Sequence, residues 1–165
     1  MLKEFNVSHE FGGILSVGKR KSARPITTKK PMHLVLRSDN ATGNLSLLKH
    51  EKLIRGILSK EAKRFYIKIY DVAVNSNHLH IGVCAKTREG FRNFLRAISG
   101  QIAKALLKKA EKKLKHFWTL TVYSRIVEWG RDFKGVLAYI HKNTLEARGI
   151  IPYTPRKRYK IQIGR

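Results

Sequence analysis

Two short β-rich segments joined by a three-residue turn constrain the fold of this chain more than any other feature. Residues 66–74 alternate apolar and polar side chains and are rich in β-branched and aromatic residues, and residues 78–85 form a second apolar run. Asn75-Ser76-Asn77, which lies between them, has the side chains that favour turns. Because such a short connection can join only antiparallel strands, we predict a β-hairpin here.

Periodic segments on both sides of the hairpin complete the order of elements. We interpret β-rich runs as strands, and apolar residues that repeat every three or four positions as buried helix faces. The predicted elements are a strand at 32–37, a helix that ends near residue 65, the hairpin, a helix that follows Thr87, a strand at 119–127 and a last helix between Asp132 and Gly149. Thr87 and Asp132 are expected to cap the starts of their helices, and Gly149 to end the last one.

The resulting order, β-α-β-β-α-β-α, begins with the split βαβ arrangement of ferredoxin-like folds. We therefore predict an α+β domain with an antiparallel sheet, helices packed on one face of that sheet, and an additional C-terminal helix. The division expected along the chain is a basic N-terminal arm at 1–31, a folded domain at 32–150 and a basic C-terminal tail at 151–165.

The charge of the chain indicates its class of partner. The net charge is +24, from 35 Lys and Arg against 11 Asp and Glu, which indicates a polyanion, with nucleic acid as the first candidate and a membrane surface as the alternative. No apolar stretch is long enough to span a bilayer, and the N-terminus lacks the apolar core of a signal peptide. Together with the single cysteine, Cys84, this favours a cytoplasmic protein without a membrane partner.

Clusters of cations suggest where nucleic acid would bind, because phosphate contacts come mainly from Lys and Arg. The alternative for each cluster is a solvated tail or an ordinary solvated helix face. The predicted contacts are Lys19, Arg20, Lys21 and Arg24 on the arm, Lys104 and Lys108 on the second helix, and Arg156, Lys157 and Arg158 on the tail.

His78 and His80 are the first candidate functional residues. Residues i and i+2 of a strand point to the same face, so the two imidazoles would lie side by side while Leu79 enters the core. Such a pair suits a metal ion, although a chain with seven histidines can contain this spacing by chance. A structural zinc site is an alternative; it requires four ligands, and beyond Cys84 on the same strand face no clear fourth ligand is found.

Tyr139 and Asn143 form a second candidate set on the last predicted helix. They are four residues apart and therefore share one face, at the margin of the apolar stripe. A residue at the margin can reach the edge of the site and still be accessible to solvent. The alternative for Tyr139 is a half-buried structural tyrosine.

These motifs in order resemble those of single-tyrosine HUH transposases. The H-L-H of residues 78–80 follows Asn75-x-Asn77, and the last helix carries Tyr139-Ile140-x-x-Asn143. The resemblance is strongest to the REP-associated tyrosine transposases of the IS200-like family, and it extends from about residue 12 to 153. Further similar stretches are Arg24–Leu36, Asn93–Arg96, Gly100–Ala103 and Ser124–Gly130.

The resemblance implies a metal-dependent endonuclease and strand transferase that acts on single-stranded or hairpin DNA. It implies that His78, His80 and Asn143 bind a divalent cation, Mg or Mn, and that Tyr139 attacks a phosphate. The product would be a 5′-phosphotyrosine bond and a free 3′-OH, which can later be rejoined. Two imidazoles are softer ligands than Mg prefers, so Mn is expected to bind more tightly.

Several alternatives remain at this point. Many relatives have proline after the Asn of the last helix, whereas Thr144 follows Asn143 here, so the helix is expected to continue towards Gly149. Tyr123 and Tyr153 are alternative nucleophiles. Relatives include monomers and homodimers that share active sites, and a non-catalytic, domesticated nucleic-acid-binding protein on the same fold is the alternative function.

Overall fold

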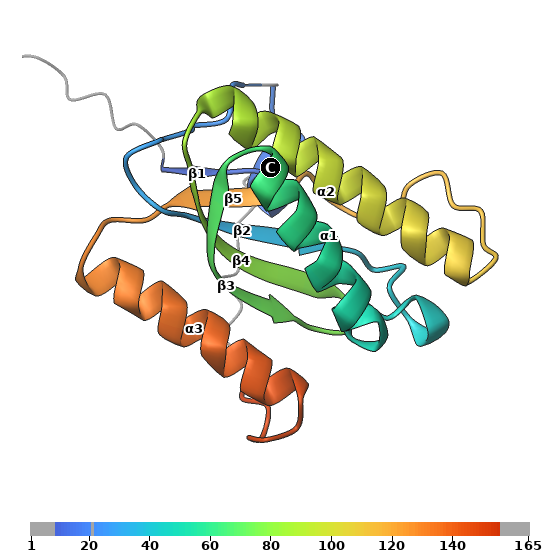
Figure 1. The fold of residues 1–165 in the computed structure, drawn as a ribbon. Coiled ribbons are helices and arrows are strands. Elements are labelled where there is room, and N and C mark those ends of the chain that lie inside the picture. Colours follow the sequence, from blue (N-terminus) through green and yellow to red (C-terminus); the bar gives the residue numbers. More distant parts are fainter. Residues whose placement is uncertain (1–8, 21, 156–165) are drawn as a thin grey trace, which may run out of the picture.

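The computed structural model describes residues 9–20 and 22–155 of the chain (Figure 1). Three short 3₁₀ turns, η1 (Gly13–Ser16), η2 (Gly43–Leu45) and η3 (Leu48–His50), accompany the main elements. Those elements are β1 (Glu10–Phe11), β2 (Met32–Arg37), α1 (Glu51–Arg64), β3 (Ile67–Val74), β4 (His78–Ala85), α2 (Arg88–Lys109), β5 (Tyr123–Ile126) and α3 (Arg131–Ala147).

The sheet has five antiparallel strands in the order β1-β5-β2-β4-β3. The predicted hairpin is β3–β4, and β4 lies in the interior of the sheet between β2 and β3. The β5-β2-β4-β3 part has the strand order of a ferredoxin-like sheet, with β1 added at its edge. The prediction of an α+β fold on an antiparallel sheet is therefore confirmed.

The two faces of the sheet have different covers. Leu79 and Ile81 of β4 are fully buried in a large apolar core together with Phe91 and Phe94 of α2. Helices α1 and α2 pack against each other on this face, as Figure 1 shows. Helix α3 packs on the other face, where Ile140 belongs to a separate small apolar cluster that includes Ala73 of β3.

Gly82 allows α3 to approach the sheet closely. A Cβ atom at this position would lie 3.4 Å from Cδ1 of Ile140 and 3.7 Å from Cδ2 of Leu137. Because Gly82 is two residues after His80, it points to the same face of β4. The absence of a side chain here lets the apolar stripe of α3 rest against the strand that carries the histidines.

The helix ends confirm two of the predicted caps and correct one. The side chain of Thr87 accepts a hydrogen bond of 2.9 Å from the Gly90 amide, and Gly149 has φ of 68° just after α3. The prediction that Asp132 caps α3 is wrong, since the N-cap is Gly130 and Asp132 lies in the first turn. Its carboxylate accepts from the Glu128 amide instead, at 3.0 Å.

Two predicted elements are shorter than expected. Helix α1 begins only at Glu51, because the residues before it form η2 and η3. The predicted strand at 119–127 is reduced to Tyr123–Ile126. The residues expected at its start make other backbone contacts: the Thr119 amide donates a hydrogen bond of 3.0 Å to the Arg37 carbonyl oxygen.

The described part of the predicted N-terminal arm contacts the fold. Glu10 and Phe11 pair with Arg125 and Ser124 of β5, and Ile26 is buried. Residues 1–8 and Lys21 lie outside the described residues. Within the described part of the chain, no helix has the length and apolar character to cross a membrane.

Candidate active site

The side chains of the α3-facing side of the sheet lie in two cross-strand rows. Because antiparallel partners that lie directly opposite each other have neighbouring side chains, the register decides which residues meet. Reading from β5 through β2 to β4, one row is Tyr123, Val35 and His80, and the other is Arg125, His33 and Gly82. The register thus brings together chemically active residues from distant parts of the sequence.

His80 has a second histidine as its partner. The Nδ1 atom of His80 lies 3.1 Å from Nε2 of His33, and the two rings stack with their centroids 5.2 Å apart. Burial, helped by the charge of Arg125, lowers the pKa of His33 to about 4. His33 is therefore neutral at pH 7 and carries one ring hydrogen. This pairing allows a tautomer in which Nδ1 of His80 donates to His33 and Nε2 of His80 keeps its lone pair.

His78 is held by the two asparagines of the hairpin turn. Its Nδ1 lies 2.7 Å from Oδ1 of Asn77, and its Nε2 lies 3.2 Å from Nδ2 of Asn75. An amide oxygen can only accept, so Nδ1 carries the hydrogen, and the lone pair of Nε2 accepts from Nδ2 of Asn75. The ring of His78 is perpendicular to that of His80, with centroids 4.9 Å apart. Asn77 thus selects the tautomer that a metal-ligating histidine needs, while Asn75 occupies the Nε2 lone pair that a metal would take.

Tyr139 of α3 lies over this histidine group. Its ring contacts His80 edge to face, with centroids 5.2 Å apart, and lies 6.0 Å from the ring of His33. Tyr139 and His80 also line one cavity of about 470 Å³ between the sheet and the first half of α3. The half-buried position that the helical pattern predicts for Tyr139 is observed.

Asn143 lies one turn after Tyr139 and is only 1% exposed. Its Nδ2 atom donates to the backbone oxygen of Tyr139 at 2.7 Å. This bond uses the amide nitrogen, so the amide oxygen is the terminal atom that could bind a cation. The continuation of α3 to Ala147 agrees with the expectation from Thr144 in place of proline.

The two alternative tyrosines have different surroundings. Tyr123 lines the same cavity, but its hydroxyl donates to Oε1 of Glu10 at 3.0 Å. Burial and this bond raise the pKa of Tyr123, which disfavours the phenolate form. Tyr153 is 66% exposed beyond the end of α3.

The predicted basic contacts are dispersed over the molecule. Lys19 and Arg20 are exposed next to η1, and Lys104 and Lys108 are exposed on α2, which covers the face opposite to Tyr139. The structure therefore does not bring the α2 cations together with the tyrosine. The predicted residues that lie outside the described residues are Lys21, Arg156, Lys157 and Arg158.

Arg24 is bound within the fold. Its guanidinium donates to Oγ of Ser124 at 2.5 Å and to the Val122 backbone oxygen at 2.8 Å, and it lies 4.5 Å above the centre of the Phe11 ring. Burial lowers the pKa of Arg24 to about 10. These contacts join the N-terminal segment to β5, so Arg24 has a structural role that the charge pattern did not reveal.

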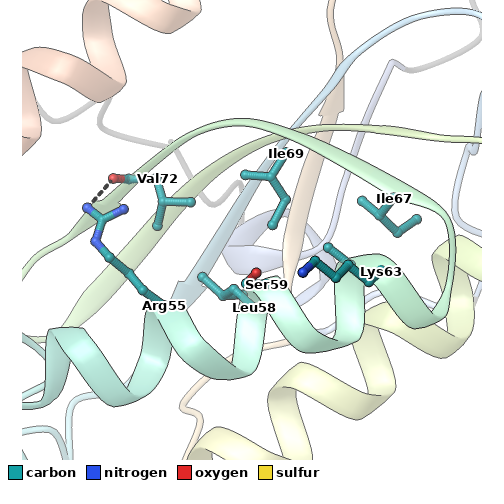
Figure 2. A pocket seen from close by; sticks show the side chains of 8 residues that line it. Arg55, Leu58, Ser59, Lys63, Ile67, Ile69 and Val72 are labelled. Atoms are coloured by element: carbon teal, nitrogen blue, oxygen red, sulfur yellow. Dashed lines mark hydrogen bonds between the residues drawn. The ribbon is translucent and has the colours of Figure 1, made fainter.

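Other clusters and cavities in the described part of the chain are less suited to metal binding or phosphoryl transfer. Among residues 9–20 and 22–155, no group of three or more His, Cys, Asp and Glu side chains is placed to hold a metal. Cys84 lies near backbone oxygens of Thr28 and Lys30, at 4.0 and 3.7 Å. A second cavity, of about 310 Å³, lies between α1 and β3 and is lined mainly by apolar side chains (Figure 2).

Sequence reasoning missed three residues of the site, which are His33, Arg125 and Asp132. One signal was available for His33, a polar residue that alternates with apolar ones in a short strand. No local signal exists for Arg125, because only the β2–β5 register places it opposite His33.

The chain is similar to known transposases. The family described as "Transposase IS200 like" matches residues 27–143, which is more than half of the chain. A solved REP-associated tyrosine transposase bound to a REP hairpin aligns with a TM-score of 0.64 and 17% identity, over 81% of this chain and 76% of that chain. A candidate transposase from Deinococcus radiodurans aligns with a TM-score of 0.47 and 16% identity, over 76% and 98% of the two chains. No curated protein matches the sequence.

Proposed function

Since the chain belongs to the IS200-like transposase family, we propose that it nicks and rejoins single-stranded DNA at hairpin sites through a 5′-phosphotyrosine intermediate. The single observation that carries this proposal is the contact between the rings of Tyr139 and His80, 5.2 Å apart in one cavity. A nucleophile next to a pair of potential metal ligands is what phosphoryl transfer to tyrosine requires. The REP hairpin bound to the similar solved protein supports hairpin DNA as the substrate class.

The proposed reaction uses the Tyr139 hydroxyl as the nucleophile. Its Oη attacks the phosphorus, a new O–P bond forms, and the bond from phosphorus to the 3′ oxygen breaks. The phenolic proton leaves Oη, and the departing 3′ oxygen takes up a proton. The products are a 5′-phosphotyrosine bond and a free 3′-OH, and the reverse reaction with an incoming 3′-OH rejoins DNA without external energy.

His78, His80 and Asn143 are the proposed ligands of a Mg²⁺ or Mn²⁺ ion. The donor chemistry fits, because His80 can present Nε2 and Asn143 can present its amide oxygen, and His78 can present Nε2 once the Asn75 amide moves away from it. When bound, the cation would polarise the scissile phosphate and stabilise its developing charge. The chain itself orients the ligands: Asn77 holds Nδ1 of His78, and His33 holds Nδ1 of His80.

Exposed cations away from the cavity are proposed to bind the DNA backbone. Lys19 and Arg20 lie near the N-terminal segment, and Lys104 and Lys108 lie on α2. A hairpin that contacts the α2 cations would have to extend around the edge of the sheet to reach Tyr139. We further propose that the reaction takes place in the cytoplasm, where a protein with one unpaired cysteine stays reduced.

The test is covalent capture of DNA. Hairpin oligonucleotides labelled at the 3′ end are incubated with protein and Mn²⁺, because the tyrosine retains the strand on the 3′ side of the nick. We expect a labelled protein band on a denaturing gel, and a free 3′-OH on the other fragment that a polymerase can extend. EDTA should abolish both products.

Tyr139→Phe is the decisive variant. It removes only the hydroxyl, so we expect normal hairpin binding in a mobility-shift assay and no covalent product. A covalent product from this variant would assign the nucleophile to another residue. Hairpin binding without any covalent product from the wild-type protein would favour the non-catalytic nucleic-acid-binding function.

A further inference from the structure

We propose that Arg125 is a catalytic residue whose guanidinium binds a non-bridging oxygen of the scissile phosphate while Tyr139 attacks. This assignment rests on the proposed function and adds a hydrogen-bond donor for the phosphate to the same site. Removing that donor should slow covalent bond formation without abolishing hairpin binding.

The first argument is position. Arg125 of β5 lies directly opposite His33 of β2, and the ring of His33 lies 6.0 Å from that of Tyr139. Arg125, Tyr139 and His80 all line the cavity of about 470 Å³. A phosphate that enters this cavity to reach the tyrosine therefore enters a space that Arg125 also lines.

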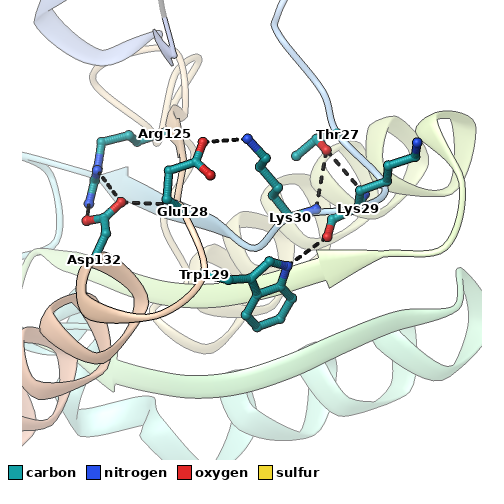
Figure 3. Close-up of polar contacts among 7 residues, drawn as sticks. All are labelled: Thr27, Lys29, Lys30, Arg125, Glu128, Trp129 and Asp132. Atoms are coloured by element: carbon teal, nitrogen blue, oxygen red, sulfur yellow. Dashed lines mark hydrogen bonds and ion pairs between the residues drawn. The ribbon is translucent and has the colours of Figure 1, made fainter.

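The second argument is that the guanidinium is held in a fixed orientation. Its two terminal nitrogens donate to the two oxygens of Asp132, at 3.1 and 2.9 Å (Figure 3). Asp132 is itself fixed by the Glu128 amide, which donates to Oδ2 at 3.0 Å. A donor that needs no reorganisation during the reaction stabilises developing charge more effectively than a mobile one.

The third argument concerns the donors that remain. A guanidinium has five N–H groups, and the two bonds to Asp132 use two of them. The bonds to Asp132 also raise the pKa of Arg125, which keeps it cationic under all conditions of interest. The side chain is 28% exposed, so it is reachable from the cavity without being mobile in solvent. Planar donor pairs of this kind suit phosphate oxygens.

The alternative is a purely structural ion pair that fastens the start of α3 to the sheet. Both roles predict a slower enzyme when Arg125 is replaced, so loss of activity alone does not separate them. The two roles differ in their dependence on the charge of the phosphate. Only a residue that touches the phosphate oxygens responds when one of those oxygens is made neutral.

The experiment uses two 3′-labelled hairpins that differ at the scissile position, one with a phosphodiester and one with a methylphosphonate. A neutral methyl group replaces one non-bridging oxygen in the second hairpin, and its diastereomers are separated. On the phosphodiester, Arg125→Gln should form the covalent product about 10²- to 10³-fold more slowly than wild type, as for loss of one transition-state donor. On one methylphosphonate diastereomer, that difference should fall to about tenfold or less.

Arg96→Gln is the matched control, since Arg96 is exposed on α2 and the substitution removes the same charge. Its rates should equal those of wild type on both hairpins. Asp132→Asn weakens the ion pair that holds the guanidinium in place. It should reduce the rate of covalent product formation by an intermediate factor, on the phosphodiester only. Thermal unfolding verifies that each variant is folded, and Arg125→Met, which also removes the donors, replaces Arg125→Gln if the latter unfolds.

An equal loss on both hairpins by a folded Arg125 variant would overturn the assignment and leave the structural ion pair. Retention of wild-type rates by that variant would overturn it as well. Wild-type protein that forms no covalent product with the phosphodiester overturns the proposed function itself, and this assignment with it. The wild-type reaction therefore tests the proposed function. The role of Arg125 is tested by comparing the loss of rate in the variant on the phosphodiester with its loss of rate on the methylphosphonate.

Discussion

The rings of Tyr139 and His80 meet edge to face, 5.2 Å apart, although one residue is on the last helix and the other is on an interior strand. Their meeting depends on the docking of α3 against β3 and β4. The same docking forms the cavity into which Arg125 and His33 also project. The distance between Tyr139 and the histidines is therefore set by how α3 packs on this face of the sheet.

Gly82 tests this dependence. A leucine here would enter the space of Ile140 and Leu137, push α3 away from β4, and destabilise the protein by about 1–3 kcal/mol through overpacking. A shift of about 1 Å between reacting groups can cost about 10²-fold in rate. Single-turnover formation of the covalent product should therefore fall strongly in Gly82→Leu. Gly82→Ala, whose Cβ would be in ordinary contact, is the control and should remain close to wild type.

The other two tyrosines should be dispensable for covalent capture. Tyr123→Phe loses the bond to Glu10, worth about 0.5–1.5 kcal/mol of stability, and Tyr153→Phe alters an exposed position. Both variants should form the covalent product at the wild-type rate, measured with the same 3′-labelled hairpin. Disappearance of the product in Tyr123→Phe would move the nucleophile to β5.

Removal of the proposed metal ligands should weaken Mn²⁺ binding. His78→Ala and Asn143→Ala each lose one donor, and we expect at least about a tenfold loss in affinity by isothermal titration calorimetry. Asn143→Asp replaces an amide oxygen by a charged one and should bind Mn²⁺ at least as tightly as wild type. His141→Ala, an exposed histidine on the same helix, is the control; a similar loss there would contradict the assigned ligand set.

The stability of the metal-free protein should depend on pH through His33. Its pKa is about 4 in the folded protein, compared with 6.5 for an ordinary histidine, so the folded state binds the proton less tightly than the unfolded state. The stabilisation is complete above pH 6.5 and is lost as the pH falls towards 4, by about 3 kcal/mol in total. Denaturant unfolding should give a steeper pH dependence for wild type than for His33→Asn. His116→Asn, at an exposed position, should match wild type.

The α2 cations should affect binding and not chemistry. Lys104 and Lys108 lie on the layer opposite to Tyr139, so they can contact only a distant part of a hairpin. Their joint replacement by glutamine should reduce the slope of log affinity against log salt by up to about 2. The rate of covalent product formation at saturating DNA should be unchanged. An unaltered salt slope would remove these residues from the DNA-binding surface.

Local patterns in the sequence predicted the hairpin and most of the helix ends, because these features depend on residues close together in the chain. The alternation of residues 66–74 and 78–85 and the Asn-rich turn predicted the hairpin, and Leu79 is buried as expected. Thr87 and Gly149 act at the helix ends because their roles depend only on nearby backbone. Asp132 was wrongly predicted as a cap, because its carboxylate lies in the first turn of α3 and pairs with Arg125, seven residues earlier on β5.

The site was only partly predictable for the same reason. His78 and His80 were identified by their strand spacing, and Tyr139 and Asn143 by their helical spacing. Their meeting depends on which face of the sheet α3 covers, and neither spacing contains that information. His33 and Arg125 belong to the site through strand register alone. Arg24 points into the fold because its guanidinium bonds Ser124 and packs on the ring of Phe11.

The docking of α3 on the sheet of its own chain has a consequence for stoichiometry. One chain supplies the proposed nucleophile and the histidines, so cutting should be first order in protein, with one strand end held per molecule. Because the hydroxyl of Tyr123 in the same cavity is bound to Glu10, Tyr139 is the one proposed nucleophile among the described residues, and a chain that holds one strand end has none left for another. Exchange between two separate DNA ends therefore requires two chains acting together, and its rate should rise with the square of protein concentration at limiting protein.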